Sequence, residues 1–315
     1  MMYLDRVGVE SRPERHTWEP DECALYAVAV GAVMADEAFT LDTFHGKDQL
    51  VYPTFVLAGV LAAEAATWPD PGFMTGDYDW DDLVLGEQAI VFHRSVPAIG
   101  DVNVVTRVGA IYDKGSGALV VLESVASDNT TRQPMFTAST GVFVVGQGSF
   151  GGERGPAASP STGIGLVSLS ARAPDATLSA VTSPVQTLLY RYAGNDRNPL
   201  HSEPETAHKH GFREPILMGQ NTLGYACRAI VHALADGDPS RVRSIAGRFA
   251  AAGYNGDTLV TEMWHGPDVG CDGRADAVVL FRVVNQSGDV LVDRGRATVA
   301  TAPGRTKHLI GRIER

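Results

Sequence analysis

The chain has 315 residues, of which 44% are hydrophobic and 20% are charged, and its formal net charge is −11. This composition is typical of a soluble globular protein with one large domain or two of ordinary size. The acidic balance argues against nucleic acid as a partner, because phosphate binding requires a basic surface. No run approaches about 18 uninterrupted apolar residues, so no membrane span is expected.

The cysteines and the chain ends indicate a compartment. Cys23, Cys227 and Cys271 show neither CxxC nor metal-ligand spacing, and their low, odd number fits reducing surroundings. Cys227 lies in the apolar run Leu223–Ile230 and is expected to be buried. The N-terminus lacks an apolar core of signal-peptide length, and the C-terminus is not a peroxisomal Ser-Lys-Leu signal. We therefore expect the cytoplasm.

The first half predicts one long helix followed by three strands. The apolar spacing over Asp21–Met34 is helical, and Asp21 is placed to cap the start. Alternating runs rich in β-branched residues predict strands, the first of them opened by a Gly-Asp turn. These runs are Gly100–Thr106, Ala118–Val125 and Met135–Val145.

A segment rich in Gly, Ser and Pro, Gly146–Gly163, separates the halves and is predicted to be a linker. Its Gly146-x-Gly148-x-x-Gly151 spacing resembles a dinucleotide-binding fingerprint, but that motif requires a helix directly after the glycines. Pro156 and Pro160 follow instead, so we expect no nucleotide site.

The second half repeats the pattern of the first. A helix is predicted from Gly219 to about Leu234, and a second Gly-Asp turn opens another set of strands. These strands are predicted over Gly256–Glu262, Ala275–Val284 and Val290–Ala300. The repeat indicates an internal duplication, and a sheet continuous across both halves would protect two strand edges from solvent.

The most informative segment runs from Asn195 to His201 and continues through Gly211–Gly219. It places a carboxylate, a carboxamide and an imidazole within seven residues, shortly before an apolar helix. An acid/base pair beside a helix N-terminus can move protons while backbone N–H groups hold an oxyanion. These groups suit the addition or removal of water next to a thioester carbonyl.

This segment resembles the hydratase motif of the MaoC-like, (R)-specific enoyl-CoA hydratase family, which includes the hydratase domain of the peroxisomal multifunctional enzyme. The matching residues are Asp196, Asn198, Pro199, His201, Gly211, Phe212, Pro215, Ile216 and Gly219. Further similarity, for example at Tyr52–Phe55, Asp113–Gly117 and Gly256–Leu259, extends the resemblance over nearly all of residues 20–300.

The resemblance implies an α+β double hotdog, in which each long helix is wrapped by a curved antiparallel sheet. We expect an N-terminal hotdog over residues 1–150, a linker over 151–170, and a C-terminal hotdog over 171–315 that carries the motif. The first half has no counterpart of the Asp-x-Asn-Pro-x-His run. It is therefore expected to lack the chemistry and to accommodate the acyl chain.

The resemblance also assigns catalytic roles. Asp196 and His201 are expected to form the catalytic dyad, although the sequence leaves open which of them is base and which is acid. Asn198 would fix the turn and hydrogen-bond the ligand or the dyad. The backbone N–H of Gly219 would donate to the oxyanion, because a residue without Cβ lets the thioester approach the backbone.

Four residues are expected to contact substrate. Arg197 belongs to a group of basic residues that would offset the negative charge of coenzyme A. Met218 stands where the family usually has His, and Gln220 and Asn221 are polar where the family is apolar or small. These departures predict a functionalised acyl group in place of a plain alkyl chain.

The sequence thus predicts a hydro-lyase that converts a trans-2-enoyl thioester and its (R)-3-hydroxyacyl thioester into one another. Coenzyme A would enter as part of the substrate, and we expect no metal, no other cofactor, and a homodimer. One alternative is a dehydratase of polyketide or other secondary metabolism. A second is a non-catalytic subunit that binds acyl thioesters, and a thioesterase is a further possibility within this fold.

Overall fold

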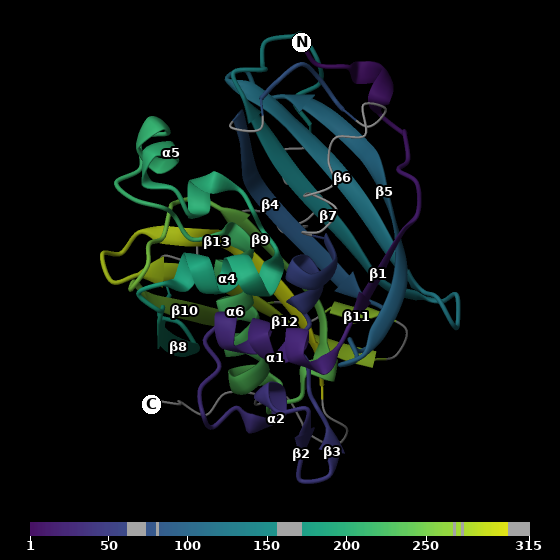
Figure 1. The fold of residues 1–315 in the computed structure, drawn as a ribbon, viewed down its shortest axis with the longest axis vertical. Coiled ribbons are helices and arrows are strands. Elements are labelled where there is room, and N and C mark those ends of the chain that lie inside the picture. The colour runs from purple at the N-terminus through teal and green to yellow at the C-terminus, as the bar shows by residue number, and fades with distance from the viewer. Residues whose placement is uncertain (62–73, 80–81, 156–171, 267–268, 272–273, 302–315) are drawn as a thin grey trace.

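A computed structural model describes residues 1–61, 74–79, 82–155, 172–266, 269–271 and 274–301 (Figure 1). Within these residues the dominant element is one antiparallel sheet with the strand order β1-β5-β6-β7-β4-β9-β13-β12-β10-β8, and β11 pairs with β12. The first-half strands are β1 (Glu14–Trp18), β4 (Leu83–Phe92), β5 (Gly100–Asp113), β6 (Gly117–Asp128) and β7 (Pro134–Val145). The second-half strands are β8 (Ala176–Val181), β9 (Val242–Phe249), β10 (Thr258–His265), β11 (Val269–Cys271), β12 (Arg274–Asn285) and β13 (Val290–Ala300).

The two halves of the strand order mirror each other about the pairing of β4 with β9. Each half contributes an equivalent set, so β1, β5, β6, β7 and β4 correspond to β8, β10, β12, β13 and β9. The halves join where β4 pairs with β9, with Ala89 opposite Ala246. This symmetry confirms the predicted duplication and the continuous sheet, and all six predicted strands are present. Most of the predicted linker lies outside the described residues.

The helices follow the same duplication. The longer ones are α1 (Pro20–Ala29), α4 (Gln186–Gly194) and α6 (Gly219–Leu234), and the short ones are α2 (Glu37–Thr40) and α5 (Pro204–Lys209). The described residues also include the 3-10 helices η1 (Leu4–Arg6), η5 (Pro199–His201) and η6 (Pro239–Arg241), the π-helix η2 (Leu57–Leu61), and the hairpin of β2 (Thr43–Phe44) and β3 (Lys47–Asp48).

Helix α6 lies in the hollow of the second-half strands and contacts β8, β9, β10, β12 and β13. Its buried side chains recur at helical spacing, including Leu223, Cys227, Ile230 and Leu234. The α+β double-hotdog prediction is confirmed, as are the start of this helix at Gly219 and the burial of Cys227.

The prediction for the first helix was wrong in its end and in its role. Helix α1 ends at Ala29, and the chain turns at Gly31, which has a φ of +86° and has no room for a Cβ beside the Tyr225 ring. It packs on α4 and α2. Among the described residues, the first-half segment that corresponds to α6 follows Pro53 and includes the π-helix Leu57–Leu61.

Aromatic side chains hold these layers together. The Phe55 ring lies 5.7 Å from both Trp18 and Tyr26, and Tyr26 lies 6.2 Å from Tyr190. All four are buried, and such ring pairs contribute about 0.5–1.5 kcal/mol each beyond their buried area. This chain of rings connects β1, α1 and α4 and so places the segment that follows α4. No helix among the described residues is long and apolar enough to cross a membrane.

Candidate active site

The segment after α4 is held by two side-chain-to-backbone turns. Helix α4 ends where Asn195 adopts the left-handed conformation, with a φ of 51°. Asp196 Oδ1 then accepts a hydrogen bond from the backbone N–H of Asn198 at 3.0 Å. Asn198 Oδ1 accepts one from Leu200 N–H at 2.9 Å and thereby caps η5, where Pro199 is the first residue. The motif is therefore a rigid loop.

The imidazole of His201 is oriented by the chain just before α6. Its Nδ1 lies 2.8 Å from the carbonyl oxygen of Ile216. Because a carbonyl only accepts, Nδ1 carries the hydrogen. In the neutral ring Nε2 is then unprotonated, and it faces Asp196 Oδ2 at 3.9 Å. The side chains of His201 and Asp196 are 13% and 26% exposed, so both reach solvent. One water molecule can bridge the gap between Nε2 and Oδ2.

The N-terminus of α6 opens onto the same space. Its N-cap residue, Met218, is buried and supplies no side-chain capping bond. The first backbone N–H groups of the helix have no partner within the helix and are available to a negatively charged oxygen. Gly219 is needed here for packing as well, because a Cβ would lie 2.8 Å from the Phe249 ring.

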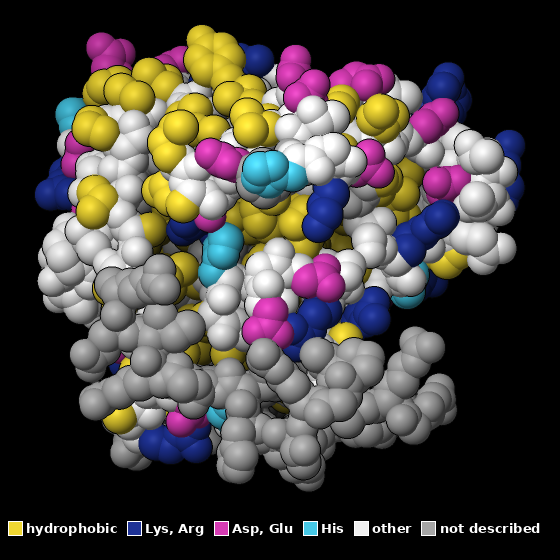
Figure 2. Space-filling view, turned by 90° about the horizontal axis from the view of Figure 1, so that it is seen from below, with side chains coloured by type: hydrophobic (Ala, Val, Ile, Leu, Met, Phe, Trp, Pro, Cys, Tyr) yellow, Lys and Arg dark blue, Asp and Glu magenta, His cyan; other side chains and the backbone are white. Residues whose placement is uncertain are grey.

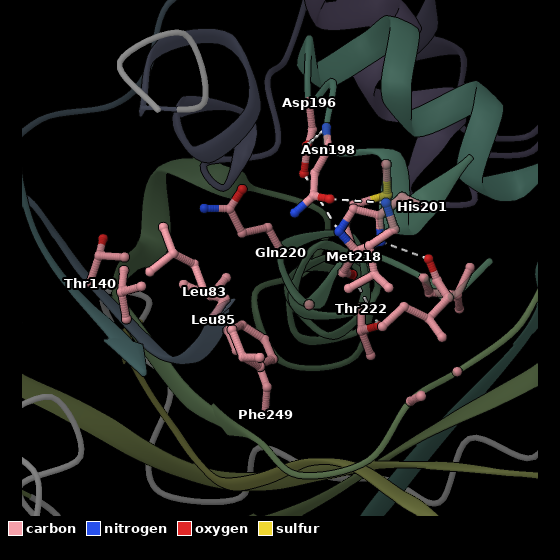
Figure 3. A pocket seen from close by; sticks show the side chains of 18 of the residues that line it. Leu83, Leu85, Thr140, Asp196, Asn198, His201, Met218, Gln220, Thr222 and Phe249 are labelled. Carbon is pink, nitrogen blue, oxygen red and sulfur yellow. Dashed lines mark hydrogen bonds and ion pairs between the residues drawn. The ribbon is translucent and has the colours of Figure 1, made fainter. Parts of the chain in front are cut away.

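These groups line one cavity of about 680 Å³ (Figure 3). The second half contributes Asn195–His201, Phe212, Ile216–Gln220, Thr222, Phe249–Gly253 and Leu291. The first half contributes Leu61, Leu83, Val84, Leu85, Thr106, Leu122, Ser124, Thr140 and Val142. Asp196, His201 and the start of α6 thus line an extended pocket whose far wall is the first-half sheet.

The structure brings together most of the predicted site residues. Asp196, Asn198, His201 and Gly219 all line the cavity, as do Met218 and Gln220. Arg197 also borders it, and its guanidinium lies 5.6 Å from the Tyr192 ring and donates to Asn195 Oδ1.

The predicted substrate contact of Asn221 was wrong. Its side chain is fully buried away from the cavity, with Nδ2 donating to the carbonyl of Ala29 at 2.8 Å. Its Oδ1 accepts from Gln186 Nε2 at 3.1 Å. Successive helical residues point about 100° apart, and this rotation turns Asn221 from the Gln220 side of α6 towards α1 and α4. Asn221 fixes α6 against α1 and α4.

Sequence reasoning missed polar residues at and directly behind the first-half wall. Gln88 on β4 is fully buried, and its Oε1 accepts from Thr140 Oγ1 at 3.1 Å and from Gln220 Nε2 at 3.5 Å. Strand alternation alone places Thr140 on the same face of β7 as the buried Ala138 and Phe136. The contact with Gln220 depends on how the two halves meet, which local sequence does not encode.

No group of three or more His, Cys, Asp or Glu side chains in the described part of the chain is arranged to hold a metal ion.

Two family profiles match the chain, each over one half. The first-half match, to the MFE-2 hydratase 2 N-terminal domain, covers residues 16–146. The second-half match, to the MaoC like domain, covers residues 167–283 and includes the whole motif.

Similar proteins align over most of their own length. A Mycobacterium tuberculosis protein named 3-hydroxyacyl-thioester dehydratase Y is 38% identical over 263 residues, which are 82% of this chain and 86% of that protein. Enoyl-CoA hydratase 2, peroxisomal, of Arabidopsis thaliana is 35% identical over 82% of this chain and 86% of its own. The crystal structure of a MaoC-like dehydratase from Phytophthora capsici superposes with a TM-score of 0.77 at 27% identity, covering 96% of this chain and 99% of that one. On this similarity of sequence and fold, the chain belongs to the MaoC-like dehydratase family in its two-unit hydratase 2 form and is an enzyme of the hydro-lyase class.

Proposed function

We propose that the protein hydrates a trans-2-enoyl-CoA to the (R)-3-hydroxyacyl-CoA, and that it catalyses the reverse dehydration at the same site. The observation that carries this proposal is the pair of Asp196 and His201 facing one cavity with the start of α6. The named activities of the similar hydratase and dehydratase support both directions.

The dyad would hold the reacting water between its two members. Because Nδ1 of His201 contacts the Ile216 carbonyl, Nε2 is left as the acceptor. Nε2 would therefore take a proton from the water as the water oxygen bonds to C3. The carboxylate of Asp196, held by the Asn198 N–H, would orient the water and stabilise the imidazolium. The dyad then returns one proton to C2, so the elements of water are added without oxidation or reduction. This balance requires no redox cofactor.

The start of α6 would stabilise the enolate. As the C2–C3 double bond is attacked, negative charge moves to the thioester oxygen, which the Gly219 N–H would bind. One such donor typically contributes about 3 kcal/mol to the transition state. Asn198 has its Oδ1 committed to Leu200 N–H, and its Nδ2 points into the cavity (Figure 3), where it would bind the ligand.

The two halves would share the substrate. The apolar first-half wall, including Leu83, Leu85 and Leu122, suits an acyl chain and contributes no member of the dyad. Arg197 would meet the negatively charged CoA at the cavity border. We propose that residues 1–150 form the acyl-binding domain and residues 171–315 the catalytic domain.

We also propose the cytoplasm as the location of the protein.

We also propose that two copies associate. Exposed apolar side chains gather on α1, at Leu25 and Val28, and around α4, at Val185, Leu188 and Tyr192. These helices pack on each other and face the viewer in Figure 1, a side that forms the upper edge of Figure 2, where hydrophobic side chains cluster. Contiguous apolar surface of this kind is typical of an interface, and an identical copy is the proposed partner.

Product chirality tests the proposed reaction. The protein is incubated with a trans-2-enoyl-CoA, and the product is offered separately to (R)-specific and (S)-specific 3-hydroxyacyl-CoA dehydrogenases. We expect only the (R)-specific enzyme to oxidise it. Oxidation by the (S)-specific enzyme alone would refute the stereochemical assignment, and release of free CoA thiol would identify a thioesterase.

A further inference from the structure

Behind the pocket wall opposite Asp196 and His201 lies a buried carboxamide whose orientation is fixed by its hydrogen bonds. Gln88 on β4 is fully buried, and its Nε2 donates to the carbonyl of Ser139 at 3.3 Å. Because a carbonyl cannot donate, the nitrogen must lie on that side. The amide oxygen of Gln88 is therefore turned towards Thr140 and Gln220.

This orientation decides what the two neighbours present to the cavity. Thr140 has one hydroxyl hydrogen, and it is donated to Gln88 Oε1 at 3.1 Å, so only lone pairs remain on its oxygen. Gln220 turns its nitrogen towards the same oxygen, at 3.5 Å, since the opposite orientation would place two amide oxygens against each other. Its own Oε1 is left on the other side of the carboxamide. Both residues line the cavity, and each therefore offers an acceptor.

The surroundings of this pair are largely apolar. Leu83 and Leu85 lie beside Gln220 and Thr140 in the pocket (Figure 3). The wall has a second pair of hydroxyl groups, those of Thr106 and Ser124, which are hydrogen-bonded to each other with Oγ1 and Oγ 2.7 Å apart. Gln220 lies between the dyad and the first-half wall (Figure 3), so the acceptors face the acyl chain beyond the carbons that react.

We propose that the acyl pocket selects a chain bearing a hydrogen-bond donor, a hydroxyl group on the tail of the 2-enoyl thioester, which Gln220 Oε1 and Thr140 Oγ1 accept. This inference rests on the proposed hydratase function and names its substrate class. A plain alkyl tail would press methylene groups against two acceptors and leave them without a donor. Sites built to bind a polar group discriminate strongly against the analogue that lacks it.

The test compares 2-enoyl-CoA thioesters of equal chain length. One has a plain tail, others carry one hydroxyl at successive tail carbons, and a third set carries the methyl ethers of those alcohols, which accept but cannot donate. We expect the best alcohol to exceed both the plain substrate and its own ether by about tenfold or more in kcat/KM. Gln220→Met and Thr140→Val should each bring that ratio towards one.

Thr137→Val is the matched control. Thr137 lies on the same strand as Thr140 but on the opposite face, between the exposed Val91 and Val125, and it should retain the wild-type ratio. Equal kcat/KM for alcohol, ether and plain chain in the wild type would overturn the inference while leaving the hydratase function intact. A preference that survives in both Gln220→Met and Thr140→Val would also overturn it. Failure to hydrate any of the substrates would instead refute the proposed function.

Discussion

At the scale of single residues, the proposed chemistry depends on backbone atoms as much as on side chains. The Ile216 carbonyl sets the tautomer of His201, and the Asn198 N–H holds Asp196. Gly219 is the first residue of α6, so its N–H has no partner within the helix. Substitution of a side chain therefore reports only part of the site, and the position of α6 relative to its neighbours matters equally.

Gly219 can be required for packing against Phe249 or for close approach of the thioester, and a double variant distinguishes these two reasons. Gly219→Ala should lower kcat/KM by about tenfold or more, because the methyl group would meet the Phe249 ring at 2.8 Å and displace the start of α6. If packing is the cause, adding Phe249→Leu should recover most of the activity. If close approach of the thioester is the cause, the double variant should stay as slow as Gly219→Ala. We expect substantial recovery in steady-state kinetics, with thermal stability recovering in parallel.

At the scale of elements, α6 connects the two halves at both of its ends. Its start reaches Gln88 through Gln220, and its last turns reach Asp36 of the first half. Arg228 Nη2 lies 2.7 Å from Asp36 Oδ2, and both side chains are buried. His232 Nε2 lies 3.3 Å from Asp36 Oδ1 and 2.7 Å from the Tyr52 hydroxyl. Removing one partner of such a buried ion pair typically costs about 3–5 kcal/mol.

The Asp36 cluster predicts a pH dependence of stability. Burial lowers the pKa of His232 below its ordinary value, and this outweighs the opposing effect of the Asp36 carboxylate. The unfolded chain therefore binds the proton more readily than the folded one. The contribution of neutral His232 is complete above the ordinary histidine pKa of about 6.5 and is lost as the pH falls below it. We expect the free energy of unfolding to fall more steeply between neutral and mildly acidic pH in the wild type than in His232→Gln. Parallel urea-unfolding profiles for the two proteins would contradict this explanation.

At the scale of the whole molecule, the symmetric sheet brings the motif residues of the second half and the apolar wall of the first half to one cavity. Residues of both halves line this cavity, and the halves are joined where β4 pairs with β9. Duplication thus supplies a second concave surface that can diverge towards substrate binding while the first retains the motif.

The proposed self-association is tested at α4. Val185, Leu188 and Tyr192 recur at helical spacing on its exposed face, so Leu188→Lys should shift the molecular mass in light scattering from that of a dimer to that of a monomer. Because Leu188 is 43% exposed, the stability of the monomer itself should change little. Val125→Lys, at an exposed apolar position of β6, is the control and should stay dimeric. A wild-type protein that is already monomeric would refute the proposal.

The parts of the structure that the sequence could predict are those with a local signal. Gly-Asp turns and β-branched alternation identified β5, β6, β7, β10, β12 and β13 but not β4, which is longer than β10. The motif placed Asp196, His201 and the start of α6 in one region. The strands β1 and β8 were not predicted because they are only five and six residues long. The role of helix α1 was predicted wrongly because its apolar residues do not face the hollow of the sheet. They face α4 and solvent, as the exposed Leu25 and Val28 show. The contact of Gln220 with Gln88 and the burial of Asn221 depend on the rotation of α6, which tertiary packing determines.

The central claim, that Asp196 and His201 perform the hydration, is tested most directly by turnover of crotonyl-CoA and of a longer 2-enoyl-CoA, followed as loss of enoyl absorbance. Wild type, Asp196→Asn and His201→Ala are compared after circular dichroism and thermal unfolding have confirmed that each is folded. We predict hydration by the wild type and a fall in kcat of about 10² or more in each variant. A folded His201→Ala protein with near wild-type turnover would contradict the account.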